Sequence, residues 1–155
     1  MTEILVGIGE YKIGKKPIIL KAIGLGSCVG VAFYDPVLKI GGLAHIMLPG
    51  RSDNGCARFA EDAINKMLRE MEKLGVKKDR IIAKMAGGAQ VFKFITIDTL
   101  KIGDRNVKSI EEHLKKLGIK VVARDVGGNK GRSMLFDTSD GSVVVKYSNG
   151  DVVWI

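Results

Sequence analysis

The sequence has 155 residues, of which 46% are hydrophobic, and a formal net charge of +8 at pH 7; this length suits one core, so we expect residues 1–155 to form a single domain. No run approaches the roughly 20 consecutive apolar residues that span a bilayer, and the first residues lack the pattern of a signal peptide, which predicts a cytoplasmic protein without membrane insertion. Basic residues are spread along the chain and aromatic residues are few, which argues against nucleic acid as a partner.

The first half of the chain has the pattern of short β-strands. Apolar or β-branched runs are separated by Gly, Pro or Asp, and the pair Asp35-Pro36 is a strong turn signal between two of them. We expect strands at residues 4–9, 18–23, 29–34 and 40–46.

Two later segments have helical periodicity. Apolar residues recur at spacings of three and four over residues 56–74, and Gly75 marks the end of this helix. The same spacing from Val107 to Leu117 predicts a second helix, which Asp104 or Asn106 caps at its start and Gly118 ends. Between the two helices, we expect a strand at 81–85, a glycine turn at 87–88 and a less regular stretch over 89–101.

The remaining sequence is again typical of strands, which we expect at residues 120–126, 133–137, 142–147 and 152–155. The order of strands, helix, strand, helix and strands does not alternate as a doubly wound parallel sheet requires. The pattern therefore predicts a fold of the broad α/β class, of α+β type or a three-layer sandwich, with mixed sheets and two main helices.

The segment 24–30, GLGSCVG, places Cys28 between glycines at the entry to a strand. Glycine lets the backbone approach a ligand closely, so an amide N–H beside the thiol can face a developing oxyanion. Neither a dinucleotide-binding loop nor a hydrolase nucleophile elbow fits, because both lead into a helix. Cys28 is thus a candidate nucleophile.

A catalytic cysteine needs an imidazole nearby, and the chain has two histidines. His45 lies near the end of the strand that follows the Asp35-Pro36 turn, so a hairpin there would bring its ring beside Cys28. His113 lies beside the apolar stripe of the second helix and is interpreted as structural. The same is true of Cys56, which we expect to open the first helix without a histidine nearby.

On the residues alone, two interpretations of Cys28 and His45 stay open. They form a catalytic pair, or Cys28 is a small buried residue in a glycine-rich bend and His45 a hydrogen-bonded strand residue. Two separated cysteines and two separated histidines do not make a metal site.

Six motifs in order resemble the chemoreceptor glutamine deamidase family, CheD. They are GIGEY at 7–11, GLGSCV at 24–29, AHIMLP at 44–49, GGA at 87–89, IGDRNV at 102–107 and DVGGNKGR at 125–132.

This resemblance implies a three-layer sandwich similar to the catalytic domain of deamidating toxins, with Cys28 as nucleophile and His45 as base. The implied reaction converts glutamine side chains of methyl-accepting chemotaxis receptors to glutamate through a thioester, without a cofactor. It also implies a CheC-type phosphatase as a partner, and Arg132 as a candidate contact to an acidic receptor helix.

The chain departs from the family at one position. Members place a threonine six residues before the cysteine, where its hydroxyl orients the histidine, and this chain has Ala22 there. A backbone carbonyl or another side chain would then have to hold the ring, and Ser27 is a possible support. The departure motivates a rival hypothesis, a regulatory module that binds the CheC-type phosphatase or receptors with weak catalysis. A general cysteine peptidase or transglutaminase is a third hypothesis.

Overall fold

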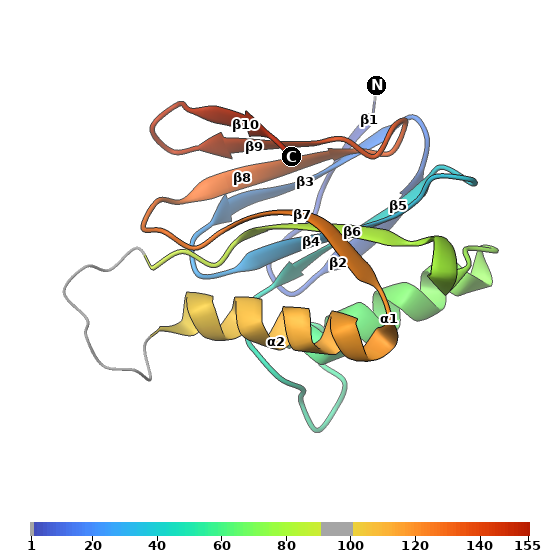
Figure 1. The fold of residues 1–155 in the computed structure, drawn as a ribbon, viewed down its shortest axis with the longest axis horizontal. Helices are drawn as coiled ribbons and strands as arrows, with labels where there is room; N and C mark the ends of the chain where they lie inside the picture. Colours follow the sequence, from blue (N-terminus) through green and yellow to red (C-terminus); the bar gives the residue numbers. More distant parts are fainter. Residues whose placement is uncertain (1, 91–100) are drawn as a thin grey trace.

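The computed structural model describes residues 2–90 and 101–155 (Figure 1). Within these residues it contains two α-helices, one short 3-10 helix and ten strands, which form two five-stranded sheets.

The outer sheet has the strand order β1-β3-β8-β9-β10. Strands β1 and β3 are parallel, and the other neighbours are antiparallel. The bounds are Thr2–Leu5 for β1, Ile18–Leu25 for β3, Arg132–Asp137 for β8, Val143–Tyr147 for β9 and Val152–Trp154 for β10.

The central sheet has the order β2-β5-β4-β6-β7. Strands β6 and β7 are parallel, and the other neighbours are antiparallel. Every residue of β4 and β5 is buried, because the outer sheet covers one face of the central sheet and helices cover the other (Figure 1). The bounds are Tyr11–Lys15 for β2, Val29–Asp35 for β4, Ile40–Ile46 for β5, Ile82–Gly87 for β6 and Lys120–Val126 for β7.

The helices are α1, Ala60–Lys73, and α2, Ile102–Leu117, and the 3-10 helix η1 spans Lys78–Arg80. The buried side chains of α1 are the predicted apolar stripe, and they pack against the central sheet in one core. A second core fills the space between the two sheets. These layers confirm the predicted α+β sandwich with mixed sheets and two main helices.

Both helices begin at other residues than predicted. Helix α1 starts at Ala60 instead of Cys56, because Leu48 and Phe59 form a β-bridge just before it. Helix α2 starts at Ile102, so Asp104 and Asn106 lie inside the helix and the prediction that either caps it was wrong.

The N-terminal strand prediction was also partly wrong. Strand β1 ends at Leu5, because Gly7 and Glu10 close a turn through a backbone hydrogen bond of 3.0 Å. Strand β2, whose sequence YKIGK alternates polar and apolar residues, was missed. Most of the less regular stretch expected at 89–101 lies outside the described residues.

Candidate active site

Cys28 lies where the chain crosses from the outer sheet to the central sheet. Strand β3 ends at Leu25, strand β4 begins at Val29, and Cys28 directly precedes it. The thiol is partly buried and packs against the core between the two sheets. The crossing therefore directs the candidate nucleophile into the space between these two layers.

His45 lies on β5, and the predicted pairing of its strand with the one after Cys28 is confirmed. Strands β4 and β5 are antiparallel, with Gly30 opposite His45. The imidazole is only 2% exposed. The hairpin at Asp35 thus places His45 opposite Gly30, which follows Cys28 by two residues in the sequence.

Cys28 and His45 face the same layer. Residues two apart along an extended chain share a face, so Cys28 lies on the side of Gly30. A Cβ built at Gly30 would lie 2.8 Å from Sδ of Met134 and 3.7 Å from Cβ of Ala22, both in the outer sheet. Cys28 and His45 therefore meet the same core between the sheets, beside a glycine whose missing side chain leaves room for Met134.

The His45 ring is held by the backbone. Its Nδ1 lies 3.1 Å from the carbonyl oxygen of Val6. A carbonyl can only accept a hydrogen bond, so Nδ1 carries the proton and Nε2 carries the lone pair. Among the described residues, the buried Nε2 has no hydrogen-bond partner. The ring thus has one fixed nitrogen and one free acceptor, and the Cys28 thiol does not hydrogen-bond to that acceptor in this structure.

Burial keeps both groups neutral near pH 7. It lowers the pKa of His45, although the Val6 carbonyl and the charge of Glu10 act in the opposite direction. Burial also raises the pKa of the Cys28 thiol. The raised pKa of Cys28 and the lowered pKa of His45 both disfavour transfer of the thiol proton to the imidazole. The resting pair is therefore a neutral thiol and a neutral imidazole.

Ala22 is fully buried on β3 and offers no hydroxyl to the histidine. The carbonyl of Val6 binds the His45 ring, and Val6 is itself tied to β3 because its N–H donates to the carbonyl of Lys21 at 2.8 Å. No residue-type signal marks a backbone carbonyl, so sequence reasoning could not name Val6.

The turn after β6 holds the Cys28 loop. The N–H of Gly88 donates to the carbonyl of Cys28 at 2.9 Å, and the N–H of Ala89 donates to that of Gly26 at 2.8 Å. Gly87 has φ +117°, and a Cβ there would lie 2.3 Å from the Cys28 carbonyl oxygen. The glycine turn that the sequence predicts is thus required for a close approach to the candidate nucleophile.

Asn106 also contacts this loop. It is fully buried on α2, and its side-chain amide donates to the carbonyl of Ser27 at 2.9 Å and to that of Met47 at 3.0 Å. Ser27 is therefore held through its main chain. Sequence reasoning noticed Asn106 but assigned it to a helix cap.

Arg132, which we expect to contact an acidic receptor helix, is engaged mainly by groups within the protein. The residue is only 4% exposed, and its guanidinium binds the carboxylate of Asp125 and the carbonyl of Gly127. It also lies 4.8 Å from the centre of the Tyr147 ring. Because the N–H of Gly127 donates to the carbonyl of Gly87 at 2.9 Å, Arg132 supports the turn that holds the Cys28 loop.

His113 and Cys56 lie elsewhere. His113 Nε2 lies 2.7 Å from Oδ1 of Asn65, and its Nδ1 lies 3.5 Å from Oε1 of Glu61, so the ring links α2 to α1. Cys56 lies in the loop before α1, and its N–H donates to Oγ of Ser52 at 2.6 Å. Both cysteines are free thiols.

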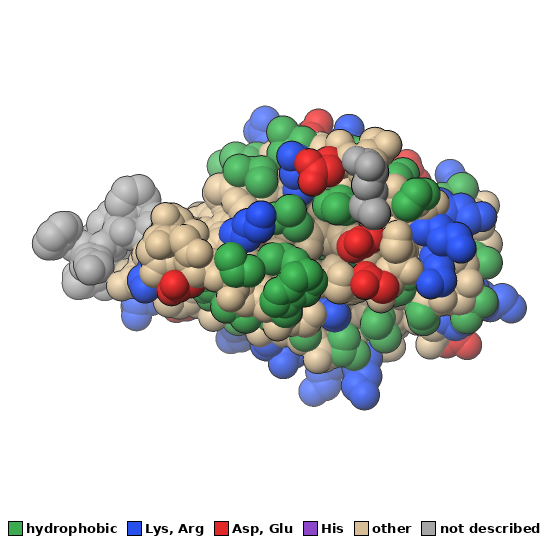
Figure 2. Space-filling view, turned by 90° about the horizontal axis from the view of Figure 1, so that it is seen from above, with side chains coloured by type: hydrophobic (Ala, Val, Ile, Leu, Met, Phe, Trp, Pro, Cys, Tyr) green, Lys and Arg blue, Asp and Glu red, His purple; other side chains and the backbone are tan. Residues whose placement is uncertain are grey.

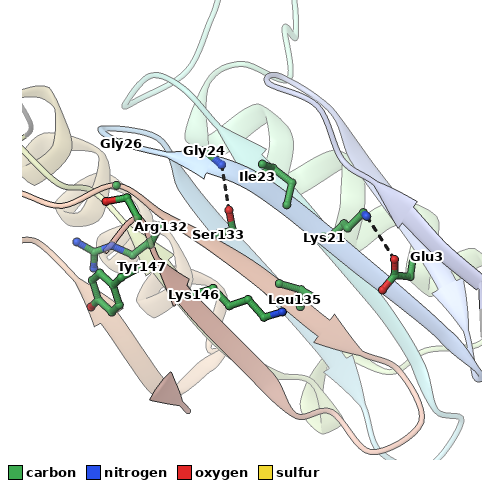
Figure 3. A pocket seen from close by; sticks show the side chains of 12 residues that line it. Glu3, Lys21, Ile23, Gly24, Gly26, Arg132, Ser133, Leu135, Lys146 and Tyr147 are labelled. Carbon is green, nitrogen blue, oxygen red and sulfur yellow. Dashed lines mark hydrogen bonds and ion pairs between the residues drawn. The ribbon is translucent and has the colours of Figure 1, made fainter. Parts of the chain in front are cut away.

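An open groove of about 600 Å³ runs over the exposed face of the outer sheet (Figure 3). Gly24 and Gly26 line one part of it, so it adjoins the loop that leads to Cys28, but neither Cys28 nor His45 lines it. At one end of the groove, Lys21 forms an ion pair with Glu3 at 3.3 Å (Figure 3). Basic side chains are spread around the rim of this side of the molecule and do not form one patch (Figure 2).

Comparison with known proteins gives a consistent result. The family model described as CheD chemotactic sensory transduction matches residues 47–147. A protein of Archaeoglobus fulgidus, named probable chemoreceptor glutamine deamidase CheD, is 54% identical over 99% of both chains. A Methanosarcina acetivorans protein with the name probable chemoreceptor glutamine deamidase CheD 2 is 53% identical over 99% of this chain and 69% of its own. A Clostridium botulinum relative with the first of these names is 46% identical over 94% of this chain and 93% of its own.

The layered fold and these matches define a chemotactic sensory transduction protein. The chain belongs to the CheD family. In the described part of the chain, no helix is both long and apolar enough to cross a membrane.

Proposed function

We propose that this chain deamidates glutamine side chains of chemoreceptors, with Cys28 as nucleophile and His45 as general base. The observation that carries the proposal is the His45 ring, whose Nδ1 is fixed by the Val6 carbonyl while the buried Nε2 has no partner among the described residues. Cys28 and His45 also face the same core between two sheets. The names of the relatives supply the substrate class.

In the first half of the proposed reaction, Sγ of Cys28 attacks the side-chain amide carbon of a receptor glutamine. His45 Nε2 takes the thiol proton as the C–S bond forms, and the amide oxygen becomes an oxyanion. We assign main-chain N–H groups of the glycine-rich loop to stabilise this charge. His45 then gives its proton to the leaving nitrogen, the C–N bond breaks and ammonia departs, which leaves a thioester on Cys28.

In the second half, water attacks the thioester carbon while His45 Nε2 takes a proton from the water. The C–S bond breaks, the Cys28 sulfur recovers the proton, and the product is a glutamate side chain. The net change is one water consumed and one ammonia released for each glutamine. Because the resting pair is neutral, the thiol proton has to move to His45 in each turnover.

The test is to incubate a cytoplasmic receptor fragment with the protein and map glutamine-to-glutamate conversion by mass spectrometry. Conversion at specific glutamines without cleavage of the backbone is expected. Cleaved backbone would identify a peptidase, and cross-linked fragments a transglutaminase. Binding of the fragment without conversion would favour the regulatory module.

Two further features belong to this proposal. The family resemblance implies a cytoplasmic protein that a CheC-type phosphatase binds, which co-elution of the two purified proteins would test. Ala22 motivates the rival hypothesis of a regulatory module, but the Val6 carbonyl supplies the hydrogen bond to His45 that this residue cannot make. We therefore favour the enzyme over the binding module.

A further inference from the structure

Asn106 links the two chain segments that carry Cys28 and His45. Its side-chain nitrogen donates to the carbonyl of Ser27, the residue before Cys28, at 2.9 Å, and to the carbonyl of Met47, two residues after His45, at 3.0 Å. Both acceptors are carbonyl oxygens, so the NH₂ group and not the amide oxygen faces them. Its two hydrogens match the two acceptors.

The link lies where the sheet itself no longer holds these segments together. The β4–β5 ladder ends at the pair Val29 and Ile46. Beyond this pair, the chain leads back through Cys28 to Ser27 on one side and forward to Met47 on the other. Asn106 bridges the two segments directly after the last ladder pair.

The start of helix α2, which carries Asn106, packs closely against the turn after β6. A Cβ built at Gly103 would lie 2.6 Å from the carbonyl oxygens of both Gly88 and Ala89, and a Cβ built at Gly88 would lie 2.4 Å from Cγ2 of Val107. The start of α2 is therefore packed directly against the turn that binds the Cys28 carbonyl. Asn106 is fully buried between these contacts.

We propose that Asn106 is a positioning residue that sets the distance between Sγ of Cys28 and Nε2 of His45. Proton transfer between the two atoms depends on this distance, and a misplacement of about 1 Å can cost about 10²-fold in rate. An asparagine suits the position because a neutral amide offers two donors on one nitrogen, whereas a carboxylate offers none. The inference rests on the proposed function of the pair.

The first test compares Asn106→Ala and Asn106→Ser with Ser109→Ala. Ser109 lies on the same helix, and its hydroxyl accepts the N–H of Gly50 at 2.8 Å, so its loss removes a contact between α2 and a loop without touching the Cys28 and His45 segments. For Asn106→Ala we expect kcat on a receptor fragment to fall about 10- to 100-fold with KM changed less than about twofold. Asn106→Ser keeps one donor and should retain more activity, and Ser109→Ala should keep the wild-type kcat.

The second readout needs no receptor. In a Cys56→Ser background only Cys28 reacts with iodoacetamide, and the pH dependence of its alkylation reports its coupling to His45. We expect the profile of Asn106→Ala to shift toward that of His45→Gln, while Ser109→Ala keeps the wild-type profile. If the wild type does not deamidate the fragment but this shift occurs, the proposed function fails and the positioning role stands.

The inference is overturned if both Asn106 variants keep kcat within twofold and the wild-type alkylation profile. It is equally overturned if Ser109→Ala loses as much activity as Asn106→Ala with the same fall in melting temperature, because the effect would then be general loosening of α2. If Asn106→Ala does not fold, Asn106→Ser is judged against the same outcomes.

Discussion

The two nitrogens of the buried His45 ring have different environments: Nδ1 is hydrogen-bonded and Nε2 is not. The Val6 carbonyl fixes the tautomer through Nδ1, and burial lowers the pKa of the imidazole, so Nε2 is an unprotonated acceptor at neutral pH. The Cys28 thiol has a raised pKa for the same reason, its burial. A neutral thiol and imidazole differ from a thiolate-imidazolium pair, in which the proton has already moved before the substrate binds. The two kinds of pair predict different pH dependences of activity.

We predict that activity falls on the acid side at a pH below 6.5. His45 must be neutral to accept the thiol proton, and its pKa in the folded protein lies below its ordinary value of 6.5. Protonation therefore removes the base only as the pH falls through that lowered value. The pH dependence of kcat/KM checks this. An acid limb centred above pH 6.5, or alkylation of Cys28 that stays fast well below neutral pH, would show a thiolate-imidazolium pair instead.

Ala22→Ser should leave the rate of deamidation within about twofold of the wild type. A neutral hydrogen bond to the ring would be worth about 0.5 to 1.5 kcal/mol, or about two- to tenfold in rate, but the Val6 carbonyl already accepts the Nδ1 proton. Ala32→Ser is the matched control, because Ala32 is also buried in the core between the sheets. A rise of tenfold with Ala22→Ser alone would mean that the Val6 bond does not orient the ring.

At the scale of elements, the β6 turn and the start of α2 carry the Cys28 loop. The turn donates hydrogen bonds to the carbonyls of Gly26 and Cys28, and α2 adds the bond from Asn106 to Ser27. These contacts join residues far apart in sequence. The loop is consequently held by backbone and amide groups at several points.

Gly87→Ala should lower the free energy of unfolding by about 3 kcal/mol or more. A side chain at positive φ costs about 1–2 kcal/mol, and a Cβ at Gly87 would also lie 2.3 Å from the Cys28 carbonyl oxygen, an overlap that costs about 1–3 kcal/mol. Gly150→Ala is the control, since Gly150 has φ +97° but open space around it. Urea unfolding of both variants checks the difference, and equal losses would contradict the close approach at Gly87.

The sequence predicts some elements well and others poorly for physical reasons. Helix α1 was found because its apolar stripe has a clear period, and the β4–β5 hairpin because Asp35-Pro36 separates two apolar runs. The α2 cap was misassigned because Asn favours caps and also suits a buried amide link. Hydrogen bonds to the Val6 and Ser27 carbonyls depend on tertiary structure. They cannot be predicted from the residue types, because every residue has a backbone carbonyl.

At the scale of the whole molecule, the three layers explain why the pair is buried. The chain crosses between sheets at Cys28, and His45 lies on a central strand that is covered on both faces. The two sheets thus bury the His45 ring and leave the Cys28 thiol partly buried, while the exposed groove lined in part by Gly24 and Gly26 adjoins the same loop (Figure 3). A large protein substrate can approach such a site from the surface.

The central claim is that Cys28 and His45 perform the reaction, and the initial rate of glutamine-to-glutamate conversion in a receptor fragment tests it most directly. The comparison needs four proteins: the wild type, Cys28→Ala, His45→Gln and Cys56→Ala, the last as a matched cysteine control. We predict that Cys56→Ala keeps the wild-type rate, that His45→Gln loses about 10²- to 10⁴-fold, and that Cys28→Ala falls to the rate without enzyme. Conversion by Cys28→Ala at the wild-type rate would contradict the account.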